Sequence, residues 1–157
     1  MRVLIAYDVQ VECCGNKYYH NFLNDILKRY SIFGELSIIV TLEDVEKPSC
    51  DEVDMGEVKK IIPITKINTL KKLVLHSATN KQIIKEAVTD SDFVIAHVPS
   101  EAANTAVRIA HKQHKPTFVT VVGCPWDALW YYDWRGKLLA PSSYLSCRKT
   151  VAMADYV

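Results

Sequence analysis

The sequence predicts an α/β fold, a Rossmann-like three-layer α/β/α sandwich with a mostly parallel sheet. Short, nearly continuous apolar runs alternate with amphipathic helical patterns along the chain, which is typical of parallel strands covered by helices on both faces. The 157 residues correspond to about one domain, and 49% of them are hydrophobic, enough for a core. We therefore expect residues 1–157 to form a single Rossmann-like domain.

The first half of the chain predicts three strands and a helix. The expected strands are residues 2–8, 35–42 and 57–64. Apolar residues recur at three- and four-residue spacing over 17–30, which predicts an amphipathic helix after a loop at Gly15. The acidic segment 43–56 is expected to be a surface loop, and 66–79 is ambiguous with a hint of helix.

The second half predicts two more strands and three helices. The expected strands are residues 92–98 and 116–123. We expect Asn80 to cap the helix before the fourth strand and Ser100 to cap the helix after it. Glu101 in the first turn of that later helix suits its dipole. Ser142 or Ser143 is expected to start the last helix.

Composition and motif content exclude several functions. The 19 basic and 18 acidic residues give a net charge of +1, which is no electrostatic footprint for nucleic acid. No apolar run approaches the roughly 20 residues of a membrane span, and the first apolar run ends at Asp8, unlike a signal peptide. We expect a cytoplasmic protein. The five Cys lack disulfide or zinc spacing, so we expect reduced thiols and no metal site.

Three loops are expected at the ligand-binding edge of the sheet, residues 8–16, 97–104 and 123–134. They follow the carboxyl ends of predicted strands, where ligands of such sheets bind. The first loop holds a single Gly, and neither GxGxxG nor GxxxxGK[ST] occurs in the chain, which argues against a dinucleotide or P-loop site. His97 could act as a general base or hydrogen-bond a ligand, or it could simply hold the strand–helix junction.

The segment 123–134 is unusually aromatic. Trp126, Trp130 and Trp134 are spaced by four residues and would share one face of a helix. Such a stripe is typical of core, yet this one is interleaved with charged residues such as Asp127. Aromatic rings beside carboxylates also suit sugar recognition, contact with another domain, or a membrane interface. The pattern alone leaves these alternatives open.

Short motifs in residues 92–157 occur in a recognisable order. The motif residues are Pro99 and Ser100, Lys115 and Pro116, residues 123–128 (GCPWDA), Gly136 and Lys137, and Ala140 and Pro141. This order resembles the second half of the N-terminal domain of bacterial GT-B glycosyltransferases, family 4-like, of capsular and exopolysaccharide synthesis. The earlier residues match only in layout. Two residues depart from the group: His97 stands where it has Arg, and Thr120 where it has Glu.

The resemblance implies the acceptor-binding half of a two-domain enzyme, with the C-terminal donor-binding domain absent. The domain would need no cofactor of its own and would be inactive alone, while the full-length enzyme would use a nucleotide-sugar donor. His97 is the implied catalytic residue. The implied acceptor-binding residues are Asp8, Glu12, Ser100, Glu101, Asn104, Cys124, Trp126 and Asp127.

The expected partners are a saccharide or lipid-linked saccharide acceptor and the missing domain. Association with the inner face of the plasma membrane and formation of a homodimer stay open. Two other functions also stay open: a stand-alone flavodoxin-like binding or signalling domain, and a non-catalytic partner subunit of a split glycosyltransferase.

Overall fold

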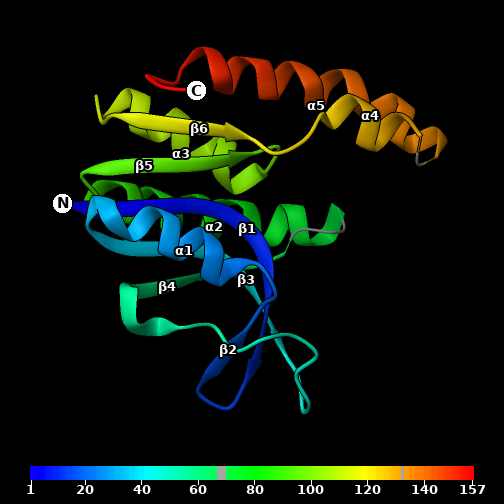
Figure 1. The fold of residues 1–157 in the computed structure, drawn as a ribbon. Coiled ribbons are helices and arrows are strands. Elements are labelled where there is room, and N and C mark those ends of the chain that lie inside the picture. Colours follow the sequence, from blue (N-terminus) through cyan, green and yellow to red (C-terminus); the bar gives the residue numbers. More distant parts are fainter. Residues whose placement is uncertain (67–69, 132) are drawn as a thin grey trace.

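A six-stranded, mostly parallel sheet lies at the centre of the computed structural model. The structure describes residues 1–66, 70–131 and 133–157, including their side chains except those of residues 57 and 70–75. The strands run in the order β4-β3-β1-β5-β6, and β2 pairs antiparallel with the end of β1. Helix α1 covers one face, and α2 and α3 cover the other (Figure 1). The predicted Rossmann-like three-layer class is therefore confirmed.

The elements have the following bounds. The strands are β1 Arg2–Cys14, β2 Lys17–Tyr19, β3 Glu35–Asp44, β4 Val58–Ile64, β5 Phe93–Val98 and β6 Thr117–Val121. The α-helices are α1 Leu23–Tyr30, α2 Leu70–Asp90, α3 Glu101–Lys112, α4 Pro125–Trp130 and α5 Trp134–Ala152, with 3-10 turns at Ser31–Phe33 and Met55–Glu57. After α5, Tyr156 forms an isolated parallel bridge to Phe118 beside β6.

Successive side chains of a strand point to opposite faces of the sheet, so alternate residues pack into two separate hydrophobic cores, one on each face. In β5, Val94, Ala96 and Val98 pack under α2, α3 and α5. Ile95 points to the opposite core, under α1, with Leu27. Small residues along α3 let that helix approach the sheet closely, since its buried side includes four alanines: Ala102, Ala103, Ala106 and Ala110.

The N-terminal prediction is wrong at residues 9–22. Instead of a loop and a long helix, β1 continues to Cys14 and turns at Gly15 into β2, while α1 begins only at Leu23. Alternation of Val9 and Val11 with polar neighbours is a strand pattern, and after an irregularity between Ala6 and Gln10 the strand pairs again with β3 from Gln10 to Cys13. Gly15 adopts φ 60°, which a tight hairpin turn favours.

Asn80 is not a helix cap. It lies within the continuous helix α2, buried, where its side chain joins the helix to the end of β4. Nδ2 donates to the Thr65 carbonyl at 2.8 Å, and Oδ1 accepts from the Thr65 amide at 3.0 Å. The capping prediction failed because the polar side chain satisfies the backbone of another segment rather than that of its own helix.

The last helix begins eight residues earlier than the earlier of the two expected starts, Ser142. Asp133 caps α5, with Oδ1 accepting from the Gly136 amide at 2.6 Å, and Pro141 stands inside the helix. The Ala140–Pro141 motif of the resemblance therefore lies within this helix rather than before it. By contrast, the prediction for Ser100 is confirmed, because its Oγ accepts from the Ala103 amide at 3.0 Å.

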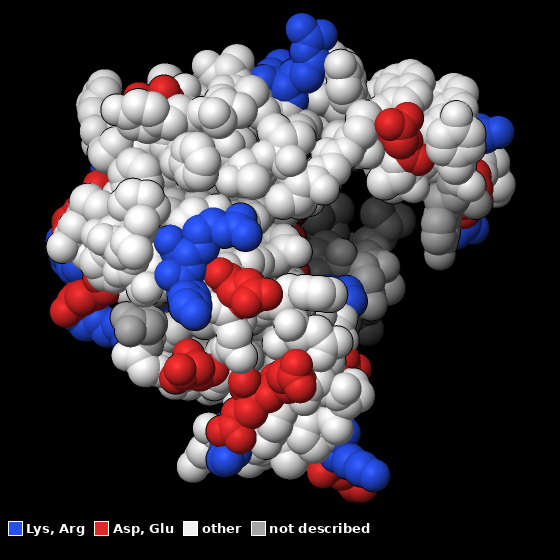
Figure 2. Space-filling model, viewed as in Figure 1, with Lys and Arg blue, Asp and Glu red and all other residues white. Residues whose placement is uncertain are grey.

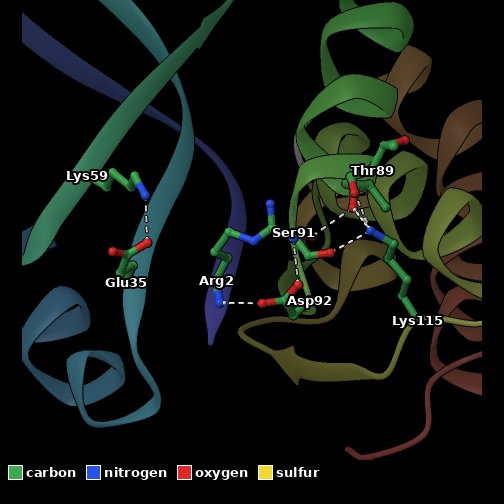
Figure 3. Close-up of polar contacts among 8 residues, drawn as sticks. Arg2, Glu35, Lys59, Thr89, Ser91, Asp92 and Lys115 are labelled. Atoms are coloured by element: carbon green, nitrogen blue, oxygen red, sulfur yellow. Dashed lines mark hydrogen bonds and ion pairs between the residues drawn. The ribbon is translucent and has the colours of Figure 1, made fainter.

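Polar contacts hold the amino edge of the sheet together (Figure 3). Asp92 accepts from the backbone amide and the guanidinium of Arg2, each at 2.8 Å, which ties β1 to the start of β5. Lys115 donates to the carbonyls of Val88, Thr89 and Ser91 at 2.7, 2.5 and 2.5 Å. It thus satisfies carbonyls at the end of α2, which gives the Lys115–Pro116 motif a structural role.

Candidate functional site

The carboxyl ends of the parallel strands lie along one edge, where the surface is hollowed beside the α4–α5 segment (Figure 2). Two cavities open near this edge. One, of about 730 Å³, lies between α2 and α3 on one side of the sheet; we call it the α2–α3 cleft. The other, of about 350 Å³, lies between the end of β6 and α5; we call it the β6–α5 pocket.

The α2–α3 cleft has a mixed lining that is rich in basic side chains. Asp8 enters it from β1, and Glu101 from the first turn of α3. Four basic side chains also line it: Lys66, Lys81, Arg108 and Lys112. Across the described residues, none of these four forms an ion pair with a carboxylate. The cleft can therefore receive both an anionic group and hydroxyl groups.

Hydrogen bonds fix parts of the cleft wall. Arg108 donates from Nη2 to Ser146 Oγ of α5 at 2.7 Å, which leaves its other N–H groups for a ligand. Lys66 hydrogen-bonds Gln10 of β1. Asn80 holds the Thr65 backbone behind them. The wall thus carries charge on side chains that are partly held in place.

The β6–α5 pocket is almost wholly apolar. Val121, Tyr144 and Val151 line it together with the thiols of Cys124 and Cys147. Burial, and then the neighbouring Cys124, raise the pKa of Cys147, so this thiol stays protonated near neutral pH. The pocket suits an apolar group rather than a metal, and no metal-binding cluster of His, Cys, Asp or Glu occurs in the part of the chain that the structure describes.

His97 lies on the other face of the sheet, away from the α2–α3 cleft. Its ring packs between those of Tyr7 and Tyr30, with centroid distances of 5.0 and 5.8 Å, and it is only 4% exposed. Its Nε2 has no hydrogen-bond partner among the described residues. Burial, and secondarily Arg29, lower the pKa of His97, so the imidazole is neutral at pH 7.

The expected acceptor-binding residues divide into several groups. Asp8 and Glu101 both line the α2–α3 cleft, while Cys124 lines the β6–α5 pocket. Ser100 and Asn104 are buried: Ser100 caps α3, and Asn104 Oδ1 accepts from Thr150 Oγ1 at 2.8 Å. These two side chains therefore hold the scaffold of the site.

Glu12 serves the β1–β2 hairpin. Its carboxylate accepts from the Ser49 amide and hydroxyl at 2.7 and 2.5 Å, and these bonds lower its pKa. Because the expected first loop is a strand, Glu12 stands apart from both cavities.

The aromatic segment splits into two helices. The rings of Trp126 and Trp130 are stacked, with centroids 4.9 Å apart, and the rings of Trp126 and Tyr144 are nearly perpendicular, with centroids 6.2 Å apart. Asp127 is exposed in the first turn of α4. Trp134 begins α5 and is 67% exposed, so the three Trp do not form one buried stripe. The interpretation of this segment as core is therefore wrong for Trp134.

Sequence reasoning missed the cations of the α2–α3 cleft. Arg108 and Lys112 are four apart on α3 and so share a face, a signal that was available. Lys66 and Lys81 gave no such signal, because only the fold brings the end of β4 next to α2. No helix in the described ranges is long and apolar enough to cross a membrane.

Fold and cavities together define a Rossmann-like α/β domain with ligand-sized cavities near the carboxyl edge of its sheet. No protein-family model matches the chain. Over its full length the chain is 29% identical to Protein CapJ of Staphylococcus aureus, and it spans 42% of that protein.

Among solved structures, a protein of Listeria monocytogenes described as a UDP-N-acetylglucosamine 2-epimerase superposes with a TM-score of 0.54 at 14% identity. The match covers 98% of this chain and 37% of that one. At this identity the similarity concerns the fold alone. The C-terminal domain of the PF1911 hydrogenase of Pyrococcus furiosus superposes less well, with a TM-score of 0.45 at 15% identity over 76% of this chain and 91% of that one.

Proposed function

We propose that this chain is the acceptor-binding domain of a nucleotide-sugar-dependent glycosyltransferase that builds a cell-surface polysaccharide. The observation that carries the proposal is the similarity to CapJ, by its name a capsule protein, along the whole chain. The chain spans 42% of CapJ, which fits one domain of a longer enzyme. The Rossmann-like fold supports the same proposal, since such domains bind ligands at the carboxyl edge of the sheet.

The proposed acceptor lies at this edge and is held mainly by hydrogen bonds. Carboxylates accept protons from sugar hydroxyls, a role that suits Asp8 and Glu101 in the α2–α3 cleft. The indole of Trp126 and the carboxylate of Asp127 offer stacking and a further acceptor near the start of α4. The donor nucleotide would bind to a second domain, and that domain would also stabilise the negative charge of the leaving group.

His97 is proposed to act as a neutral base on a part of the acceptor that extends past the strand ends to the α1 side of the sheet, opposite the α2–α3 cleft. The uncharged imidazole can accept a hydrogen bond or a proton from a hydroxyl, and its Nε2 is unused within the described structure. Because the ring is 4% exposed, the acceptor hydroxyl reaches it only if Tyr7 or Tyr30 yields space. This requirement makes the two tyrosines part of the proposed site.

The proposal is tested by titrating the 157-residue protein with two ligand classes, followed by backbone amide NMR. Capsular oligosaccharides should shift amides of the start of α3 and of residues near Asp8. UDP-sugars should shift none, because the donor site would belong to the other domain. Binding of a UDP-sugar at this edge, or its epimerisation by the isolated chain, would contradict an acceptor role.

A further inference from the structure

We propose that the α2–α3 cleft binds an anionic carbohydrate, a sugar that carries a carboxylate or a phosphate. This inference rests on the proposed function and deepens it by naming the class of acceptor. The cleft combines four cations, two carboxylates and several hydroxyl groups within one cavity of about 730 Å³. That volume lies within the roughly 300–1,000 Å³ range of small-molecule sites.

The cations converge from three parts of the fold. Lys66 follows β4, Lys81 comes from α2, and Arg108 and Lys112 come from successive turns of α3. The chain as a whole is nearly neutral, at +1, so this concentration of positive charge is local. Like charges gathered in one cavity repel one another, even in water. A bound anion would offset this repulsion.

The charges are available because they are not neutralised inside the protein. Elsewhere basic side chains pair with acids at short distance, as in Lys17–Glu52 at 2.8 Å and Lys59–Glu35 at 2.7 Å (Figure 3 shows the second pair). Within the described part of the chain, no carboxylate lies within 4.0 Å of the charged nitrogens of the four cleft cations. Asp8 and Glu101 line the same cavity and yet remain apart from them.

The remaining lining indicates a sugar rather than a bare anion or a nucleotide. Hydroxyl groups of Thr65, Ser77 and Thr105 add donors and acceptors suited to a polyhydroxylated ligand. The carboxylates of Asp8 and Glu101 would repel a small free anion, but they can accept hydrogen bonds from sugar hydroxyls. No aromatic side chain is found among the described residues that line the cleft, so it offers no ring on which a nucleobase would stack.

The inference is tested by calorimetric titration of the 157-residue protein at low salt. The probes are cellobiouronic acid, glucose 6-phosphate, the neutral sugars cellobiose and glucose, inorganic phosphate and UDP-glucose. At least one of the two acidic sugars should bind ten-fold or more tightly than its neutral counterpart, and its affinity should fall as salt is added. Which of the two acidic sugars binds will show whether the cleft recognises a carboxylate or a phosphate on the sugar.

Variants locate the binding. Lys81→Gln removes a charge that forms no hydrogen bond or ion pair with the described residues, so folding should be kept. Arg108→Gln with Lys112→Gln removes two more charges. We expect each variant to lower the affinity for the acidic sugar at least three-fold, and the double variant to lower it ten-fold. Lys28→Gln with Lys47→Gln, a matched loss of two charges away from the cleft, should leave the affinity unchanged.

Three results would overturn the inference: equal affinity for acidic and neutral sugars, inorganic phosphate binding as tightly as the preferred acidic sugar, or unchanged affinity in the cleft variants. If neutral oligosaccharides bind and acidic ones gain nothing, only the charge of the acceptor is wrong and the proposed function stands. Preferential binding of UDP-glucose would instead contradict the proposed function itself.

Discussion

Among single residues, His97 is the most unusual. Its ring is packed between two tyrosines, and its Nε2 is buried with no partner in the described structure. Leaving a buried polar atom unsatisfied costs about 1–3 kcal/mol. A cost of this size at the end of a central strand is typical of a functional site, where stability is lower than packing alone would allow.

Replacement of His97 by Phe should therefore stabilise the protein. Phe keeps an aromatic ring between Tyr7 and Tyr30 and removes the unsatisfied nitrogen, so the free energy of unfolding at pH 7.5 should rise by about 1 kcal/mol. Urea denaturation measures this change. A loss of more than 1 kcal/mol would show that Nε2 is satisfied, for example by bound water.

The same variant should alter the pH dependence of stability. Burial lowers the pKa of folded His97 below its ordinary 6.5, so the unfolded chain binds more protons in this range. Wild-type stability should therefore fall as pH decreases from about 6.5, and His97→Phe should reduce this slope. His20, whose pKa burial also lowers, keeps a part of the slope in both proteins.

In the full-length enzyme that the proposed function implies, His97 should matter for turnover. His97→Ala should lower kcat ten-fold or more, an effect expected for loss of a general base. His97→Phe should lower it equally, although the fold is retained or stabilised. If His97→Phe turns over at the wild-type rate, His97 has only a structural role.

Asp92 should contribute to stability in acid. Hydrogen bonds from Arg2 lower its pKa to about 2, below its ordinary value of 3.8. Its contribution is present above about pH 4 and is lost as pH falls through about 2. Asp92→Asn should reduce the loss of stability between about pH 4 and about pH 2, as followed by circular dichroism. Asp90→Asn, on the neighbouring helix end, is the matched control and should leave the curve nearly unchanged.

At the scale of elements, α4 and α5 form a hairpin whose approach depends on one glycine. A Cβ on Gly136 would stand 2.2 Å from the carbonyl oxygen of Leu129, so only glycine allows this contact. The hairpin also relies on Asp133 as the cap of α5 and on contact between Trp126 and Tyr144. Backbone proximity, rather than a large core, thus joins these helices.

Gly136→Ala should disturb this hairpin. The steric overlap forces α4 away from α5, and we expect a loss of about 1–3 kcal/mol of stability, as for overpacked sites, despite the higher helix propensity of Ala. Tryptophan fluorescence and chemical denaturation measure the change. Gly123→Ala is the matched control, because a Cβ there meets no atom within 4 Å. Equal stability of the two variants would contradict the close approach.

At the scale of the whole molecule, stability is unevenly distributed. The central strands bury residues such as Ile5, Ile38 and Ile95 completely. The α4–α5 segment instead leaves large apolar side chains exposed, including Trp134 at 67%, Leu138 at 70% and Leu145 at 54%. Local stability follows buried apolar contact, so this segment belongs to the weaker part of the fold.

Native-state hydrogen exchange should reveal this difference. Amides of α4 and of the first two turns of α5 should exchange through local opening, with free energies several kcal/mol below those of β1, β3 and β5. Mass spectrometry of peptides covering these segments measures the rates. Uniform protection across the chain would show that the α4–α5 segment unfolds only with the sheet.

Much of the fold follows from the sequence alone, because its signals are local. Apolar runs predict the central strands to within a few residues, and the position of Ser100 before a helix predicts its role as a cap. The errors arose where a local pattern had two readings. Residues 9–14 alternate as a strand does, and Pro141 is tolerated inside a helix although it commonly marks a helix start.

Only the tertiary structure determined the candidate site. The sequence identified Asp8, Glu101 and His97 as residues near strand ends, but not that His97 lies on the opposite face of the sheet from the α2–α3 cleft. It also gave no indication that Lys66 and Lys81 join Arg108 and Lys112 there, since no local pattern links these segments. A strand order of β4-β3-β1-β5-β6 brings them together, and this order is decided by long-range packing.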